Sequence, residues 1–309
     1  MEKFLNYSRI IGSNILLSQG PGGNTSTKKN GEIFIKKTGK YLIDSVNKDT
    51  FQKVNLINIE NFYIKEKSDK KYLKSLSIET PIHVMLKDRH IFHYHSVASI
   101  IISIIFQEKI IIPFLSKNKM TFIPYKRPGF ELAVEIKKNY NKDSVNVFFL
   151  KNHGMIVAGN NLEKVYKQIN QSENAFKSLL DYGRLKKIFQ ATKFIRNDKR
   201  TIKIKNLSPN LNFERFNDLY FFPDHAVFAS YNFQHISKTR KTSKRLIYFD
   251  SDYLYLNFKL NTVEEIYMKL LLSIYFYIEE NKLIGYISKK DGVTLKGSKD
   301  EKQRIEINK

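Results

Sequence analysis

Cysteine is absent from the 309-residue sequence. The chain therefore has no disulfide, no thiolate nucleophile and no cysteine ligand for zinc. An unbroken apolar run of membrane-spanning length is also missing, because the most apolar stretch, residues 99–115, is interrupted by Gln107, Glu108 and Lys109. The first twenty residues lack the continuous apolar core and the small-residue cleavage pattern of a signal peptide. These absences predict a soluble cytoplasmic protein with no membrane partner.

Acidic residues are few beside basic ones: 30 Asp and Glu stand against 53 Lys and Arg, for a formal net charge of +23. Such an excess would suit a nucleic-acid partner. The lysines are spread along the chain, however, and Ile and Asn are also abundant, which is typical of an AT-rich coding sequence. We therefore expect no nucleic-acid partner, and interpret the one dense basic stretch, residues 236–245, as a solvated loop.

Hydrophobic residues make up 42% of the chain, enough to bury a sizeable core. Apolar positions between residues 3 and 17 fit a helix with one buried face, which ends at a glycine- and proline-rich loop. Thr80 and Pro81 suit the start of a helix at 77–88. Further helices are predicted at 97–106 and at 162–183, the latter ending at Gly183, and strands at 31–43, 56–64, 89–96 and 145–161.

The predicted strands are short and follow one another closely. The strand–turn–strand segments around Thr38 and His153 leave no room for crossover helices, so they favour antiparallel pairing. We therefore expect an α/β fold with a central, largely antiparallel sheet flanked by helices.

The pattern changes near residue 195. We expect a first domain over residues 1–194 and a smaller α+β region over 195–309. In the second region, 219–231 and 246–258 are interpreted as strands. Residues 262–281 are predicted to form a long helix, whose apolar side chains could supply part of a subunit contact. The polar end of the chain is predicted to form a short helix and a tail.

Three of the seven histidines occur in a pattern that suits a metal ion. His93 and His95 lie two apart in a predicted strand, so both imidazoles point to one face. His153 lies in a tight turn beside Gly154, just after another strand. Three neutral imidazoles with one open position describe a catalytic zinc site. The spacing alone also fits two histidines packed in a sheet, and an HxH pair by itself is a weak signal.

Glu79 precedes a predicted helix, whose N-terminal dipole favours the charged carboxylate. Beside a metal it could hold the ion or move a proton. The alternative is a residue that only begins the helix. His83 falls on the same helical face and is interpreted as a packing residue or a supporting one, not as a ligand.

The stretch "QGPGGNTSTK" (19–28) offers backbone N–H groups and side-chain donors to an anion. Thr38-Gly39 forms a second such turn, and Ser77 lies two residues before Glu79. Taken singly, each is also ordinary turn chemistry.

The order of these motifs is more specific than any one of them. "QGPGGNTSTK", "IFIKKTGKYL", "LSIETPIHVML", "HIFHYHSV" and "LKNHGMIVAG" together resemble the class II (metal-dependent) aldolase and adducin-like family over about residues 3 to 190. "FFPDHAVF" and the closing "KDEKQRIEIN" resemble, less specifically, the C-terminal extension of its longer members. The resemblance implies a class II aldolase-like fold for residues 1–194.

The resemblance also implies roles for residues. His93, His95 and His153 match the zinc ligands, although another divalent metal would fit the same set. Glu79 matches the catalytic acid/base. Asn24, Thr38, Gly39 and Ser77 match the positions that hold the substrate phosphate. Ile78 replaces a serine that commonly donates to that phosphate, so an unphosphorylated sugar substrate stays open.

The implied activity is zinc-dependent aldol cleavage of a ketose phosphate or a related sugar substrate by a homo-tetramer. A 4-epimerase is the nearest alternative, but Glu79 stands where epimerase-type sites carry Asp. A dehydratase or decarboxylase on the same scaffold stays open. A non-catalytic adducin-like module would be expected to lose its ligand histidines, and all three are present.

Overall fold

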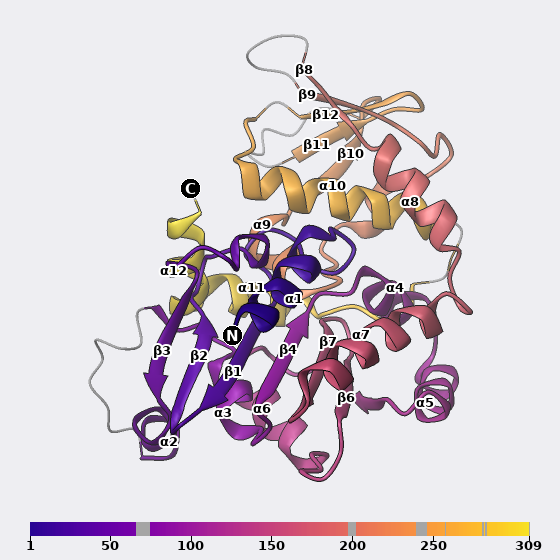
Figure 1. Ribbon diagram of the computed structural model, residues 1–309. Helices are drawn as coiled ribbons and strands as arrows, with labels where there is room; N and C mark the ends of the chain where they lie inside the picture. The colour runs from indigo at the N-terminus through magenta and orange to yellow at the C-terminus, as the bar shows by residue number, and fades with distance from the viewer. Residues whose placement is uncertain are drawn as a thin grey trace.

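The computed structural model describes residues 1–65, 75–196, 202–238, 246–256, 258–279, 281 and 283–308. Two β-sheets of different size are joined by helices (Figure 1). Residues 239–245 of the predicted basic loop lie outside the described ranges. In the part of the chain that is described, no helix has both the length and the apolar character needed to cross a bilayer.

The larger sheet has seven strands in the order β3-β2-β1-β4-β7-β6-β5. All neighbouring strands pair antiparallel except β5 and β6, which are parallel. The prediction of a largely antiparallel sheet is therefore confirmed. The strands are β1 (Asn24–Lys29), β2 (Glu32–Lys36), β3 (Phe51–Asn55), β4 (His90–Tyr94), β5 (Thr121–Ile123), β6 (Asn146–Leu150) and β7 (Gly154–Gly159).

Both faces of this sheet are covered. Side chains alternate along β4: Ile91 packs into the core beneath α3 (Thr80–Met85) and α6 (Phe130–Lys138), while Phe92 and Tyr94 pack into the main core on the opposite face. That opposite face is covered by helices α1 (Glu2–Ser13), α4 (Val97–Ile105) and α7 (Leu162–Phe176), with α5 (Glu108–Lys117) and α8 (Tyr182–Ala191) beside them. The alternation places His93 on the α3 side of the sheet.

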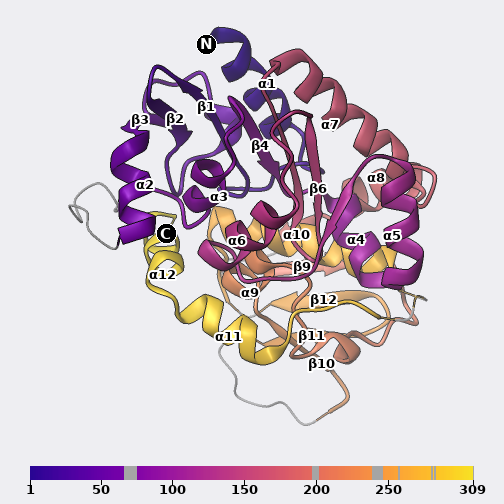
Figure 2. The same cartoon turned by 90° about the horizontal axis from the view of Figure 1, so that it is seen from below.

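The smaller sheet has five strands in the order β10-β11-β12-β9-β8. Its strands are β8 (Phe194–Arg196), β9 (Ile202–Lys205), β10 (Asn232–His235), β11 (Leu246–Phe249) and β12 (Tyr253–Leu256). Helix α10 (Thr262–Tyr277) lies between the two parts, and one apolar core runs from α1 through α10 to this sheet. Helices α11 (Lys289–Gly297) and α12 (Lys299–Ile307) then return to the large sheet (Figure 2).

Several local predictions are wrong. The second short strand expected after Thr38-Gly39 is instead a 3-10 helix, Leu42–Asp44, and the polar end of the chain forms the two helices α11 and α12 instead of one short helix and a tail. Residues 56–64 belong to helix α2 (Leu56–Lys65), because Leu56 and Ile59 share one packed face and the Asn55 side chain accepts from the Asn58 amide. The segment 219–231 contains helix α9 (Pro223–Phe228), whose first turn holds the proline that a strand interior disfavours. Gly183 lies inside α8 instead of ending a helix, since Asp181 caps that helix through the Arg184 amide.

Helix α10 also differs from expectation in its packing. The side chains of Tyr267 and Met268, and all those from Leu270 to Tyr277, are buried within the chain. The apolar surface that was expected to contribute to a subunit contact therefore serves the core of the single chain.

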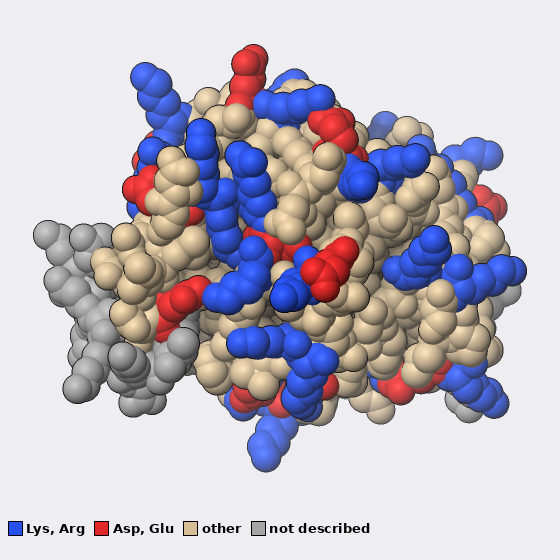
Figure 3. Space-filling model, turned by 60° about the horizontal axis from the view of Figure 1, so that its bottom comes forward, with Lys and Arg blue, Asp and Glu red and all other residues tan. Residues whose placement is uncertain are grey.

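Basic side chains are spread over the face shown in Figure 3, and acidic ones lie among them. Many lysines of the described residues form ion pairs, such as Lys87 with Glu60 and Lys37 with Asp49. The visible charge is thus distributed over several elements.

Candidate metal centre

Strand β4 brings the first histidine to the site. His93 is opposite Asn24 of β1 and Ile156 of β7, and its side chain is fully buried. Its Nδ1 lies 2.9 Å from the Met155 carbonyl oxygen. Because a carbonyl only accepts, Nδ1 carries the hydrogen and Nε2 is left to face Glu79, 3.0 Å away.

His95 lies just beyond the end of β4, where Ser96 caps helix α4. Its Nε2 is 3.2 Å from His93 Nε2, as the period-two spacing predicted for two side chains on one face. Its Nδ1 points away from the cluster, toward Asp224 Oδ2 at 3.1 Å. Both histidines therefore direct Nε2 to the same point.

His153 comes from the turn between β6 and β7. Asn152 has a φ of +56° and Gly154 a φ of +148°, a pair of angles that turns the chain within the buried site. A Cβ at Gly154 would lie 2.4 Å from the Tyr94 carbonyl oxygen, so glycine is required there. The turn places His153 Nε2 3.1 Å from Glu79 Oε1.

Glu79 occupies the N-cap position of α3 and is nearly buried. Ligand-type atoms of Glu79, His93, His95 and His153 all lie within 4.8 Å of one another. Zinc bonds of about 2.0–2.1 Å in a tetrahedron separate neighbouring ligand atoms by about 3.3 Å. Three of the separations, His93–Glu79, His153–Glu79 and His93–His95, are 3.0 to 3.2 Å and close to that value.

The arrangement of these donor atoms favours the binding of a cation. With Nδ1 of His93 and His95 directed to oxygen acceptors, the lone pairs of both Nε2 atoms face each other and the Glu79 carboxylate. Two acceptors 3.2 Å apart repel unless a metal or a proton lies between them. The residues present therefore fit a divalent metal with nitrogen and oxygen ligands.

The close packing of these side chains shifts the pKa values of Glu79, His93 and His153. Burial opposes ionisation of Glu79, but the adjacent His93 and His153 outweigh it and hold the pKa of the carboxyl well below its usual range. Burial also opposes charge on His93, yet Glu79 raises the pKa of that imidazole. At His153 burial dominates and lowers the pKa to about 4. Glu79 and His93 thus shift each other's pKa in opposite directions, each favouring the charged form of the other.

The glycine-rich loop before β1 packs closely on the histidines. A Cβ at Gly22 would lie 2.7 Å from His95 Nδ1, and one at Gly23, where φ is +75°, 3.0 Å from the His93 carbonyl oxygen. Lys36 supports the loop by donating from its buried ammonium to the Pro21 carbonyl at 3.0 Å. The loop thus has a packing role, which its interpretation as an anion cradle did not anticipate.

The four residues expected to bind phosphate are distributed around the cluster. Asn24 is buried beside His93, and its side-chain amide has no hydrogen-bond partner among the described residues. Ser77 accepts from the Glu79 amide at 3.3 Å. The Thr38 amide donates to the Ser75 carbonyl, and Gly39 lies under Ile307 of α12, with 2.6 Å between the nearest side-chain carbon and a Cβ added there. The turn at Gly39 is therefore covered by the chain itself.

A cavity of about 430 Å³ adjoins this region. Ser77, Ile78 and Pro81 line one side of it, and Leu295, Ser298 and Asp300 of the returning helices line another. Glu79 lies in the chain between Ser77 and Pro81, which both line this cavity. Helix α3 therefore borders both the cluster and the cavity.

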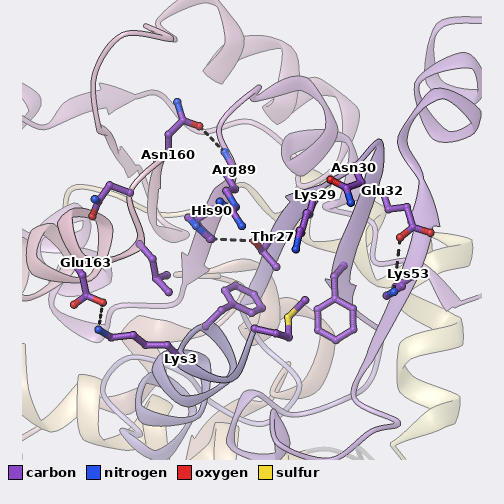
Figure 4. Close-up of a pocket in the computed structure, with 15 residues that line it drawn as sticks. Lys3, Thr27, Lys29, Asn30, Glu32, Lys53, Arg89, His90, Asn160 and Glu163 are labelled. Carbon is purple, nitrogen blue, oxygen red and sulfur yellow. Dashed lines mark hydrogen bonds and ion pairs between the residues drawn. The ribbon is translucent and has the colours of Figure 1, made fainter.

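A larger cavity, of about 600 Å³, lies at the other end of β1 and β4, around Thr27 and His90 (Figure 4). Its charged rim is partly paired, Lys3 with Glu163 and Lys53 with Glu32. We place the site at the histidine cluster because the cluster, and not this cavity, gathers three imidazoles and a carboxylate. His83, in contrast, bonds Ser26 at 2.8 Å, and burial lowers its pKa to about 3.

Three further residues at the centre, all from the C-terminal region, were not predicted from the sequence. Asp224 of α9 contacts His95, Tyr267 of α10 and Arg304 of α12. Burial opposes the charge of Asp224, but Arg304, His95 and Tyr267 hold the pKa of its carboxyl below the usual range. The available signals were the stretches "FFPDHAVF" and "KDEKQRIEIN", which contain Asp224 and Arg304 but carry no information about what these side chains pack against.

The N-terminal part of the chain matches a known protein family. Residues 3–180 match the class II aldolase and adducin N-terminal domain. The chain therefore belongs to the class II aldolase and adducin family, whose members include metal-dependent lyases as well as epimerases and non-catalytic adducins.

Individual relatives are more distant. The chain is 26% identical over 191 residues to the uncharacterized oxidoreductase YuxG of Bacillus subtilis, a match that covers 54% of this chain and 28% of YuxG. It thus spans less than a third of that relative's length. The N-terminal class II aldolase domain of a conserved protein from Thermoplasma acidophilum is 24% identical, with a TM-score of 0.49, 57% of this chain and 92% of that one being covered. L-fuculose-1-phosphate aldolase from Thermus thermophilus is 17% identical, with a TM-score of 0.42, and the match covers 60% of this chain and 98% of that one.

Proposed function

We propose that this protein is a zinc-dependent class II aldolase that cleaves a ketose phosphate or a related sugar by a retro-aldol step. The observation that carries the proposal is the buried group of three imidazole Nε2 atoms and one carboxylate, with the lone pairs directed to a common point. The family includes metal-dependent lyases, and this donor set is one that could hold their metal. Residues 1–194 are proposed to form the catalytic domain and 195–309 an extension.

The three histidines would hold the metal, with Glu79 able to reach it or to leave it for substrate. When bound, a divalent ion supplies a Lewis acid that polarises the substrate carbonyl and stabilises the negative charge left as the carbon–carbon bond breaks. Glu79 would carry the proton to and from the carbon beside that carbonyl.

Asn24 and Ser77 are proposed to contact substrate. Asn24 supports this with a buried amide beside His93 that lacks a partner in the described structure, since such a group is costly to bury unbonded. Thr38 and Gly39 complete the proposed set, but Ile307 covers Gly39 and Ile78 lines the adjoining cavity in place of a hydroxyl donor. Both features favour a substrate with little or no dependence on a phosphate.

The decisive experiment is a substrate panel. The zinc-loaded protein and the same protein treated with a chelator would be given ketose 1-phosphates and unphosphorylated sugar acids, and the aldehyde product would be measured. We expect cleavage of at least one substrate, lost on chelation and restored by zinc. Isomerisation without aldehyde release would indicate an epimerase instead. Absence of any turnover by a protein that binds zinc would contradict the proposal.

We also propose a homo-tetramer, in keeping with the family resemblance. Static light scattering at micromolar concentration is expected to give about four times the 36.4 kDa chain mass. A monomeric mass would contradict this part alone.

A further inference from the structure

Asp224 belongs to a region with no part in the family match, which ends at residue 180. Helix α9, which carries it, lies where the C-terminal region meets the large sheet (Figures 1 and 2). The Asp224 carboxylate is 1% exposed. A carboxylate is expensive to bury without partners, so its contacts identify what it is there to hold.

Both oxygens of Asp224 are occupied. Oδ1 accepts from the Arg304 guanidinium, and Oδ2 lies 2.5 Å from the Tyr267 hydroxyl and 3.1 Å from His95 Nδ1. Arg304 is in turn held by Glu301, whose Oε2 lies 2.9 Å from its Nε. Toward His95 the carboxylate therefore offers an acceptor, and His95 must donate its Nδ1 hydrogen. The Nε2 lone pair is then left for the cluster.

On its other side, the glycine-rich loop packs closely against this contact. At Gly22, a Cβ would lie 2.7 Å from His95 Nδ1 and 2.9 Å from Asp224 Oδ2. The Tyr267 hydroxyl also lies 2.8 Å from the Gln19 carbonyl, and Gln19 donates from Nε2 to the His95 carbonyl at 3.1 Å. Loop and helices together enclose the His95–Asp224 contact.

We propose that Asp224 is a positioning residue of the metal centre: it orients His95 for coordination, and Arg304 and Tyr267 orient Asp224. The proposal rests on the metal-dependent function argued above. It gives residues 195–309 a defined task, because three helices of that region act on one ligand. A carboxylate behind a metal-binding histidine fixes the ring and its tautomer, and removing such a partner typically weakens metal binding about 10- to 100-fold.

The test measures metal directly. Zinc affinity of the full-length protein would be determined by competition with a chromophoric chelator, and cobalt substitution would report the ligand field by visible absorption. Asp224→Asn is expected to weaken zinc about 10- to 100-fold and to alter the cobalt spectrum. Tyr267→Phe, which keeps the ring stacked on Phe228, is expected to lose less than about tenfold, because Arg304 still holds the carboxylate.

Two control variants and a second test variant accompany these measurements. Asp252→Asn changes an exposed carboxylate at the β11–β12 turn and should leave zinc affinity unchanged. Gly22→Ala should weaken zinc by pushing on the same contact even if Asp224→Asn fails to fold, whereas Gly297→Ala, with open space around it, should not. Near-UV circular dichroism would confirm the fold of each variant.

Wild-type affinity and an unchanged cobalt spectrum in folded Asp224→Asn or Gly22→Ala would overturn the positioning role and leave the proposed function standing. A lower melting temperature with unchanged zinc affinity would do the same, because it indicates a merely structural contact. Failure of the wild-type protein to bind zinc would instead refute the metal centre and, with it, this inference.

Discussion

Two regions meet at the proposed metal centre, and they contribute different groups to it. The large-sheet region supplies every ligand-type atom of the cluster, from a strand, a turn and a helix start within residues 79 to 153. The C-terminal region supplies none of these atoms but contacts one of the proposed ligands, His95, through Asp224. In the proposed site, the large-sheet region would bind the metal, and the C-terminal region would orient one of the side chains that bind it.

The orienting contacts also differ among the three proposed ligands. His93 is oriented by a backbone carbonyl of its own sheet, at Met155, which no side-chain substitution removes. His95 depends on a side chain from a distant helix. His153 Nδ1 has no hydrogen-bond partner among the described residues. Substitutions should therefore affect the three ligands through different elements, which makes the comparison testable.

The largest effect is expected from the ligands themselves. His93→Ala should abolish zinc binding at stoichiometric metal, because it removes one of the three imidazoles. Metal content after gel filtration, measured by inductively coupled plasma mass spectrometry, checks this. His90→Ala removes an imidazole from the other end of the same strand, where it bonds Thr27, and should retain zinc. Equal zinc in both variants would contradict the assignment.

A smaller effect, confined to turnover, is expected at Glu79. Glu79→Gln keeps the size of the side chain and all three histidines but cannot accept a proton. Zinc should remain bound, while the rate with a confirmed substrate should fall about 10²- to 10⁴-fold. Parallel measurement of metal content and kcat separates the two. Loss of zinc with loss of rate would show that Glu79 serves mainly as a ligand.

In the C-terminal region, the next expected effect is a loss of stability on substitution of Arg304. Arg304→Met removes the cation that faces buried Asp224 and Glu301, and unfolding free energy should fall by about 3–5 kcal/mol, the usual effect of breaking a buried pair from one side. Urea denaturation monitored by circular dichroism measures it. Lys302→Met, on the exposed side of the same helix, should change stability by less than about 0.5 kcal/mol. Comparable losses of unfolding free energy in both variants would indicate that any substitution in α12 destabilises the protein and that the ion pair has no special effect.

The smallest effect is a pH dependence at Lys36. Burial lowers the pKa of this ammonium to about 7 from an ordinary value of 10.5. The unfolded chain therefore binds a proton that the folded chain lacks between these values, so this residue's contribution to stability rises with pH, by about 1.4 kcal/mol per unit, and is lost as pH falls toward 7.

Lys36→Met should flatten this slope in metal-free protein, as urea midpoints at about pH 7.5 and 9 would show. Lys53→Met, an exposed control, should leave the slope unchanged. A residual slope in Lys36→Met is expected, because burial also lowers the pKa of Lys28 to about 7. An unaltered slope would mean that Lys36 stays charged in the folded protein.

Much of the large-sheet region was predictable because its signals are local. The spacing of His93 and His95, the Asn-His-Gly turn and the proline after Glu79 each describe geometry within a few residues, and the structure brings these four side chains together. Their roles as metal ligands and acid/base stay predictions. So do the phosphate contacts and the domain boundary at residue 195.

The parts that could not be predicted depend on distant packing. Asp224 is one of many carboxylates in the sequence, and only the burial of α9 against His95 distinguishes it. Residues 56–64 combine strand-forming side chains with an N-terminal asparagine cap, and the cap together with the packing of Ile59 decided for a helix. Apolar α10 is buried by its own chain, which its composition alone does not reveal.

The contact between Tyr267 and the Gln19 carbonyl spans 248 residues of sequence. Closing so long a loop has an entropic cost that only the finished core offsets, and contacts at such separation slow folding. The turn that carries His153 is tied in the same way, since the Asn152 side-chain amide donates to the Phe221 and Gly285 carbonyls. The two regions should therefore unfold in one cooperative transition, and zinc, which binds the folded chain, should raise its midpoint as a single step.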